Sequence, residues 1–322
     1  ARFCRALVYF TGVNLFAQPF QINQGSNLGL PLVTEFFVGD IEPFKKERAT
    51  LNETHAFIES DLLFGVDNLP SSNGIRATSA SAKALLSRLY LYREQWTSAA
   101  NMANDVINTS GVSLASDLSF YNATSSEHLF QVINTSDDAA FGNDFDTFYN
   151  PTSNNGRGDL TMTEDLQNAF LAEPDDLRYT TLTYDDTDAG NLAARFTAKY
   201  PNGATNESDP NVLRVAEMYL NRAEANLRGG TSIGDTPLND VNAIRERAGL
   251  TALTSVTLED VLLERRKELA FEGHRRMDLL RNGQNLKPDN GAVSAPGGAK
   301  TILPIPNTEL IQNPNISQNP TY

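Results

Sequence analysis

Apolar residues recur at three- and four-residue spacings from the first residues of the chain onward. The positions that share one face at about 3.6 residues per turn are Phe3, Ala6, Leu7, Phe10 and Val13. This pattern predicts a helix that is already under way at the first residue, because no capping residue precedes it. We therefore expect the natural protein to begin earlier than this segment.

Helical periodicity returns near Leu51, after a long polar loop that follows Pro19. Thr50 and Glu53 have the spacing of a capping box, in which each side chain binds the backbone N–H of the other residue at a helix N-terminus. We expect this helix to continue to about Asn68.

Two pairs of helices are predicted further along the chain, at residues 81–111 and 211–250. The first pair turns near Glu94 to Trp96, and we interpret Trp96 as a packing residue of this hairpin. In the second pair, residues 211–230 form the first arm and residues 237–250 the second. Both pairs are similar to tetratricopeptide-like repeats, in which neither helix can bury its apolar face without its neighbours.

The periodicity weakens between about 111 and 210, where Asn, Asp, Gly and Thr dominate and aromatic residues cluster. This composition predicts loops with a few short helices or strands. The predicted fold is mainly α, with tetratricopeptide-like helical hairpins at about 1–110 and 211–283 and a large loop-rich irregular insertion between them. An extended segment at 284–322 follows, and we interpret residues 1–322 as a single domain.

Charge and cysteine content narrow the functional classes. Forty acidic and twenty-six basic residues give a formal net charge of -14, which repels phosphate backbones and argues against nucleic acid as a partner. Cys4 is the only cysteine, so an internal disulfide and a multi-cysteine metal site are excluded. The sequence contains no run of about eighteen apolar residues, so no transmembrane helix is predicted.

The most charged stretch, Glu264 to Gly283, reads ERRKELAFEGHRRMDLLRNG. As one helix, it would place Glu268 and Glu272 with their Cβ atoms roughly 6 Å apart. That distance is near the separation of about 5 Å that the two carboxyl groups of a retaining glycosidase require. However, neighbouring arginines favour the ionised carboxylate, whereas a general acid must hold its proton near neutral pH. We therefore predict no catalytic residues here.

The sequence gives little support for a metal site or an anion site in this stretch. His274 has no second histidine at metal-ligand spacing, and DDTDAG at 185–190 lacks the glycine and glutamate positions of a calcium loop. Arginines could bind an anion, but the interleaved glutamates already supply partners. We predict a structural ion-pair network, with no metal and no cofactor. Its members on one helical face would be Arg265, Glu268, Glu272 and Arg275 or Arg276.

The charged stretch also carries a family resemblance. ERRKELAFEGHRRMDLLR, preceded by VNAIRERAGL and followed by ILPIPNTELIQNPNISQNPTY, resembles the signature set of the SusD/RagB family. AEMYLNRAEA and RFCRALVYF are similar to two further family helices, and the order of the family is kept over nearly the whole chain. Arg276 and Asn282 stand where the family often has tryptophan, and Thr321 stands where it usually has glycine.

The resemblance implies a lipid-anchored, non-catalytic protein on the outer face of a Bacteroidetes-type outer membrane. Such a protein binds an oligosaccharide or polysaccharide and passes it to a SusC-like TonB-dependent transporter. Membrane contact would be only through an N-terminal lipid absent from this chain, since Cys4 lies inside a predicted amphipathic helix. A tetratricopeptide-like adaptor for protein peptides and a glycoside hydrolase are the alternatives.

A glycan site is predicted in the segment from Asp137 to Asp159, where aromatic residues lie among Asn, Asp and Gly without a regular period. Sugar rings stack on aromatic faces while amide and guanidinium groups bind the hydroxyls. The candidate residues are Phe145, Phe148, Tyr149, Asn154 and Arg157, with Phe141 nearby. We choose Tyr149 as the platform, although such rings can also simply fix a loop to the core.

Overall fold

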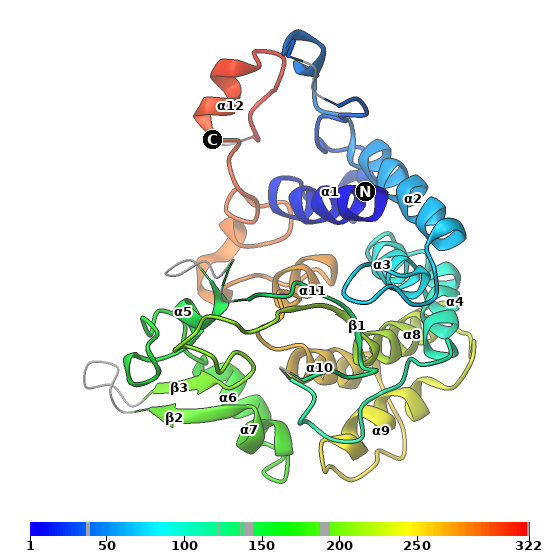
Figure 1. Cartoon of the computed structure of the whole chain (residues 1–322), viewed down its shortest axis with the longest axis vertical. Coiled ribbons are helices and arrows are strands. Elements are labelled where there is room, and N and C mark those ends of the chain that lie inside the picture. The colour runs from blue at the N-terminus through cyan, green and yellow to red at the C-terminus, as the bar shows by residue number, and fades with distance from the viewer. Residues whose placement is uncertain (37–38, 122, 136, 138–143, 187–193, 321) are drawn as a thin grey trace. The chain divides into compact units, whose positions relative to one another are not determined.

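A computed structural model describes residues 1–36, 39–121, 123–135, 137, 144–186, 194–320 and 322 (Figure 1). The longer helices are α1 (Arg2–Phe16), α2 (Leu51–Asn68), α3 (Ser79–Tyr92), α4 (Trp96–Ile107), α8 (Val215–Gly229), α9 (Pro237–Arg247) and α10 (Leu258–Glu268). The shorter helices are α5 (Phe145–Tyr149), α6 (Glu164–Leu171), α7 (Leu177–Thr181), α11 (Arg275–Arg281) and α12 (Asn307–Gln312). The strands are β1 (His128–Gln131), β2 (Thr183–Asp186), β3 (Ala194–Thr197) and β4 (Asn211–Arg214). The predicted mainly-α class is confirmed.

The chain divides into two compact units, which are described separately. The first comprises residues 1–69, 88–95 and 275–322, and the second comprises residues 70–87 and 96–274. The interpretation of residues 1–322 as a single domain stays a prediction. Among the described residues, no helix is both long and apolar enough to cross a membrane.

In the first unit, α1 packs against α2. The predicted face of α1 is buried, except that Leu7 is only half-buried. The predicted capping box of α2 is confirmed, because Thr50 N donates to Glu53 Oε2 at 2.8 Å and Glu53 N donates to Thr50 Oγ1 at 3.1 Å. This helix begins and ends at the predicted residues.

In the second unit, α8 packs against α4, α9 and α10 (Figure 1). The small residues Ala99, Ala100 and Ala103 of α4 are fully buried, which lets the helix backbones approach closely. Ser87 Oγ of α3 donates to the carbonyl oxygen of Ala99 at 3.0 Å. The two predicted helical pairs are therefore present as helices α3 and α4, and α8 and α9.

The predicted helix at 211–230 is wrong for its first four residues. Asn211–Arg214 form β4, which pairs antiparallel with β1, so that His128 lies opposite Arg214 and Gln131 opposite Asn211. Arg214 has extended backbone angles, φ -146° and ψ 162°, and α8 begins after it. Pairing with a segment distant in sequence overrides the local helical pattern. The other short elements of the insertion agree with the prediction of loops with few helices or strands.

The prediction of one helix over the charged stretch is also wrong. Helix α10 ends at Glu268, and the left-handed residues Phe271 (φ 66°) and Gly273 (φ 82°) separate it from α11. Lys199 Nζ donates to the carbonyl oxygens of Glu268 and Ala270, at 2.9 Å in each case. These contacts satisfy carbonyl groups at the end of α10, so the helix can stop inside the protein without leaving them unpaired.

Candidate functional site

Oppositely charged side chains meet in the interior of the second unit and form the buried charge cluster. Its basic members are Arg178, Lys199, Arg214 and Arg247, and its acidic members are Glu127, Asp176, Glu264, Glu268 and Glu272. Arg214 Nη1 lies 2.6 Å from Glu268 Oε1, and its Nε lies 2.7 Å from Glu272 Oε2. Arg178 Nη1 lies 2.6 Å from Glu264 Oε1. These distances are those of charge-assisted hydrogen bonds.

The ionised state of the cluster carboxylates follows from these partners. Burial would raise the pKa of Glu272, but Arg214 and Lys199 lower it to about 2. Burial acts in the same direction on Glu268, and Arg247, Arg214 and Arg178 bring its pKa well below the usual range. Neither carboxyl group holds a proton near neutral pH, so neither is suited to general acid catalysis.

The five residues of the predicted ion-pair network do not lie on one helical face. Glu268 and Glu272 belong to the buried charge cluster. Arg265 Nη1 donates to Asn221 Oδ1 at 2.6 Å, and its Nε lies 3.9 Å from Glu224 Oε2. Arg276 of α11 donates to the carbonyl oxygens of Asn14, at 2.6 Å, and of Thr301. Arg275 is exposed at the first position of α11.

The buried charge cluster joins the insertion to the helical hairpins. Arg178 and Lys199 come from the insertion, whereas Arg247 and Glu268 come from α9 and α10. Within the described ranges, no group of three or more His, Cys, Asp or Glu side chains could hold a metal ion. Of the segment 185–190, only Asp185 and Asp186 lie among the described residues. The cluster therefore links the insertion to α9 and α10 through buried ion pairs.

The aromatic residues predicted for glycan binding lie together on and after α5, and we call Phe145, Phe148, Tyr149, Asn154 and Arg157 the aromatic surface. The rings of Phe145 and Tyr149 are nearly parallel, with an interplanar angle of 6° and centroids 6.0 Å apart. Arg157 lies over the ring of Phe148 with its guanidinium carbon 5.3 Å from the centroid, and it pairs with Asp159 at 3.0 Å.

The two stacked rings differ in how much of their surface is exposed to solvent. Phe145 is 41% exposed, whereas Tyr149 is half-buried. The ring of Tyr149 packs against Tyr200, with centroids 5.4 Å apart, and edge-on against Phe271 at 5.7 Å. Tyr149 therefore packs beneath the surface, and Phe145 is the ring that is more exposed to solvent. Phe141 lies outside the described residues.

Two residues of this cluster, Tyr200 and Phe271, were missed by sequence reasoning. Tyr200 is buried, and its hydroxyl donates to the carbonyl oxygen of Phe271 at 2.9 Å. Phe271 reaches Tyr149 because of the left-handed backbone that separates α10 from α11. No periodic pattern signals either contact, since both depend on segments far apart in the sequence.

Amide side chains fix the loop that carries Asn154. Asn154 Nδ2 donates to Asn150 Oδ1 at 2.9 Å and to the carbonyl oxygen of Pro201 at 3.1 Å. Asn150 Nδ2 in turn donates to the carbonyl oxygen of Tyr200 at 2.7 Å. The close approach requires Gly203, because a Cβ atom there would lie 1.9 Å from the carbonyl oxygen of Asn154. The amide of Asn154 is therefore already used in part to hold the loop.

Asp146 connects α5 to a second loop. Its buried carboxylate accepts from Asn202 N at 2.9 Å, from Ser208 N at 2.9 Å and from Ser208 Oγ at 2.7 Å. The segment that ends at Asp209 is thus held by the same short helix that presents Phe145. Three donors on one carboxylate make this arrangement rigid.

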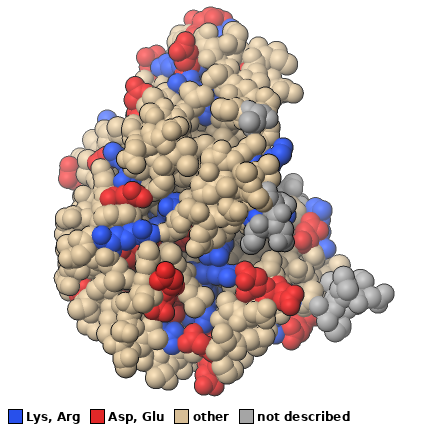
Figure 2. Space-filling model, turned by 180° about the vertical axis from the view of Figure 1, so that it is seen from behind, with Lys and Arg blue, Asp and Glu red and all other residues tan. Residues whose placement is uncertain are grey.

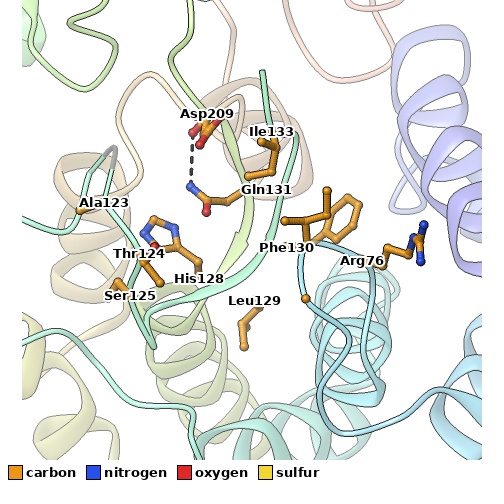
Figure 3. Close-up of a pocket in the computed structure, with 12 residues that line it drawn as sticks. Arg76, Ala123, Thr124, Ser125, His128, Leu129, Phe130, Gln131, Ile133 and Asp209 are labelled. Carbon is orange, nitrogen blue, oxygen red and sulfur yellow. Dashed lines mark hydrogen bonds between the residues drawn. The ribbon is translucent and has the colours of Figure 1, made fainter. Parts of the chain in front are cut away.

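A pocket of about 460 Å³ lies next to that segment, and we call it the β1 pocket (Figure 3). Its walls are β1, the loops at 74–76 and 123–125, and Asp209. The side chains that give it its chemistry are Arg76, His128, Phe130, Gln131 and Asp209. This volume lies within the usual range for small-molecule sites, roughly 300–1,000 Å³.

His128 is held in place at this pocket. Its Nδ1 lies 2.6 Å from Asn211 Oδ1, and its Nε2 lies 3.0 Å from the carbonyl oxygen of Phe120. Burial and the nearby Arg214 lower the pKa of His128 to about 4. The imidazole is therefore neutral near pH 7 and carries one N–H, so it donates to one of these two oxygens, according to its tautomer.

One face of the protein carries mixed charge. On the face shown in Figure 2, acidic and basic side chains lie close to one another instead of forming separate areas of one sign. Arg157 with Asp159 and Arg195 with Asp185, at 3.0 and 2.9 Å, show the same pairing near the aromatic surface. Such pairing leaves this part of the surface with little local preference for a ligand of either charge, although the chain as a whole has a formal net charge of -14.

Comparison with known proteins places these features in a family. A family model described as "SusD family" matches residues 174–322. A second model, described as "Starch-binding associating with outer membrane", matches residues 1–91. A SusD-like protein of Bacteroides ovatus is 26% identical over 326 residues, a region that covers 87% of this chain. The chain spans only 58% of that relative's length.

Solved structures agree over the whole chain. A SusD superfamily protein from Bacteroides vulgatus has a TM-score of 0.88 at 28% identity, covering 100% of this chain and 76% of that one. A structure named as a laminarin-binding SusD-like protein has a TM-score of 0.76 at 26% identity, covering 100% and 77%. The sequence signatures, the helical fold and both family models together show that the chain belongs to the SusD/RagB family.

Proposed function

We propose that this protein is a non-catalytic glycan-binding protein that captures an oligosaccharide or polysaccharide at the aromatic surface. The observation that carries the proposal is the exposed ring of Phe145, which Tyr149 and Tyr200 hold in a fixed orientation. A ring that is already immobilised loses little side-chain entropy when a sugar stacks on it. Arg157 lies on the same surface and can donate to sugar hydroxyls.

The relatives support the choice of ligand. One matching family model is described as starch-binding, and one structural relative is named as laminarin-binding. Starch and laminarin are neutral glucose polymers, and the paired charges near the aromatic surface suit a neutral ligand better than a polyanion. We therefore propose neutral glycans as the first candidates.

Binding without cleavage is part of the proposal. The relatives are named for binding, and the carboxylates at positions 268 and 272 are buried and ionised, so they do not provide the proton donor that glycoside hydrolysis needs. A helical adaptor for protein peptides is less well supported, because the exposed aromatic surface lies in the insertion, outside the helical hairpins.

The cellular setting is proposed from the family. The full-length protein would be lipid-anchored at the outer face of the outer membrane and would deliver its glycan to a SusC-like TonB-dependent transporter. One matching family model is described as associating with the outer membrane. Purification of the full-length lipoprotein from its host in mild detergent should recover such a transporter, and its reproducible absence would contradict this part.

Affinity electrophoresis in gels containing starch, laminarin or an anionic polysaccharide tests the glycan proposal. We expect a neutral glycan to retard the wild-type protein and Phe145→Ala to migrate as it does without glycan. Phe36→Ala is the matched control, because Phe36 is 83% exposed and lies outside the insertion. Release of reducing sugar ends, or wild-type retention in Phe145→Ala, would count against the proposal.

A further inference from the structure

The β1 pocket contains an arginine whose charge is not matched by the protein. Arg76 is exposed, and among the described residues its guanidinium group forms no ion pair. Its backbone N–H donates to the carbonyl oxygen of Asn73 at 3.1 Å, which shapes the loop. Most other arginines in this unit are paired, so the guanidinium group of Arg76, which points outward at the edge of the pocket in Figure 3, is available to a ligand.

The part of the pocket away from Arg76 offers hydrogen-bond acceptors. Asp209 Oδ1 accepts from Asn134 N at 2.8 Å, and the carboxylate has a second oxygen for another donor. Gln131 Nε2 donates to the carbonyl oxygen of Asp209 at 3.4 Å, which holds the two residues together (Figure 3). The carboxylate is fixed but not saturated.

This combination selects the chemical class of the ligand. Arg76 and Asp209 carry opposite charges at different ends of the pocket, so a simple anion or cation would be matched at only one of the two ends. A sugar hydroxyl donates and accepts with the same group, so a polyol satisfies both ends of the pocket. Phe130 adds a half-buried ring against which the apolar face of a sugar can lie.

We propose that the β1 pocket is a second carbohydrate subsite, which takes a neutral terminal or branching sugar of the bound glycan. This inference rests on the proposed function. The walls on several sides of the pocket suit a chain end, whereas the open aromatic surface suits the body of a chain. Asp146 holds both sites in one unit through α5 and Ser208, so that one ligand can be presented with a fixed arrangement of contacts.

The first test uses the three histidines as local reporters. Protein with isotope-labelled histidine is titrated with maltoheptaose and with laminariheptaose, and the ring signals are followed by NMR. We expect the signal of His128 to shift to saturation, because this ring lines the pocket. The signals of His55 and His274, which are buried elsewhere, should remain in place.

The second test measures affinity by calorimetry. Arg76→Ala and Asp209→Asn should each weaken oligosaccharide binding by about tenfold, the usual effect of losing a hydrogen bond to a charged group. Lys46→Ala, which removes a charge in the other unit, should bind as wild type. Unchanged melting temperatures of Arg76→Ala and Asp209→Asn would show that the fold is intact.

The outcomes separate the two proposals. If Phe145→Ala loses the oligosaccharide while Arg76→Ala and Asp209→Asn bind as wild type and His128 does not shift, the second subsite is overturned and the glycan function stands. If the wild-type protein binds neither oligosaccharide nor any polysaccharide, the proposed function fails, and the subsite fails with it.

Discussion

Arg214 of β4 and Glu268 at the end of α10 form a buried ion pair, with Nη1 and Oε1 2.6 Å apart and each side chain 1% exposed. The same guanidinium group binds Glu272 at 2.7 Å, so one strand residue holds both the end of α10 and the segment that follows it. The charged groups of this cluster are buried away from water. Removing any one of them would leave a partner charge buried and unpaired, which lowers the stability of the protein.

Replacing Glu272 by Ala should lower the free energy of unfolding by about 3 kcal/mol, because Lys199 and Arg214 would then lose a buried partner. Chemical denaturation with urea measures the change. Glu47→Ala is the control, since Glu47 is exposed. Equal unfolding midpoints for wild type and Glu272→Ala would contradict this role.

The same carboxylate predicts a dependence of stability on pH. The pKa of Glu272 is about 2 in the folded protein, whereas an unfolded glutamate titrates near about 4.3. The contribution of Glu272 to the free energy of unfolding is present above about pH 4.3 and is lost as the pH falls toward 2. In that range the glutamate of the unfolded chain binds a proton more readily than that of the folded protein. Urea unfolding across this range should show a shallower decline in Glu272→Gln than in wild type. If stability declined equally with pH in wild type and Glu272→Gln, Glu272 would not be the source of the pH dependence.

The two stacked rings should respond differently to truncation. Tyr149→Ala should lower both glycan affinity and melting temperature, because Tyr149 packs on Tyr200 and Phe271, and we expect a loss of about 2–3 kcal/mol in stability. Phe145→Ala should lower affinity with a smaller loss of stability than Tyr149→Ala, since Phe145 is 41% exposed whereas Tyr149 is half-buried.

Calorimetry and thermal unfolding of the same samples separate these effects. Tyr149→Phe keeps the ring and should retain both properties. Should Tyr149→Ala, with its fold intact, bind the cognate glycan as tightly as wild type, the assignment of Tyr149 to the aromatic surface would be wrong.

Trp96 should report unfolding but not glycan binding. The ring is half-buried at the start of α4, and the guanidinium carbon of Arg228 lies 5.1 Å from its centroid. A Cβ atom at Gly229 would lie 3.2 Å from Trp96 Cβ, which places this side chain against the end of α8. Trp96 is the only tryptophan, so fluorescence during titration with maltoheptaose measures this directly. Quenching by the sugar would contradict its role as a packing residue.

Local patterns were sufficient to predict the elements whose signals lie within a few residues. The capping box of Thr50 and Glu53 and the spacing of Phe3, Phe10 and Val13 act within one helix, so the sequence alone determined where α2 begins and which face of α1 is buried. The family signatures are likewise contiguous segments. The composition of the segment from Asp137 to Asp159 singled out Phe145 and Tyr149 as candidates, whereas the short helix that brings their rings together was not predicted.

Contacts between distant segments decided the rest. Pairing of β4 with β1 made residues 211–214 a strand, and Lys199 satisfied the carbonyl groups at the end of α10, so the charged stretch became two helices. The partners of Glu268 likewise come from segments up to 90 residues away. Such choices depend on which groups meet after the chain has folded, because a buried charge or carbonyl group must find a partner wherever the tertiary structure offers one, and a single sequence does not state that location.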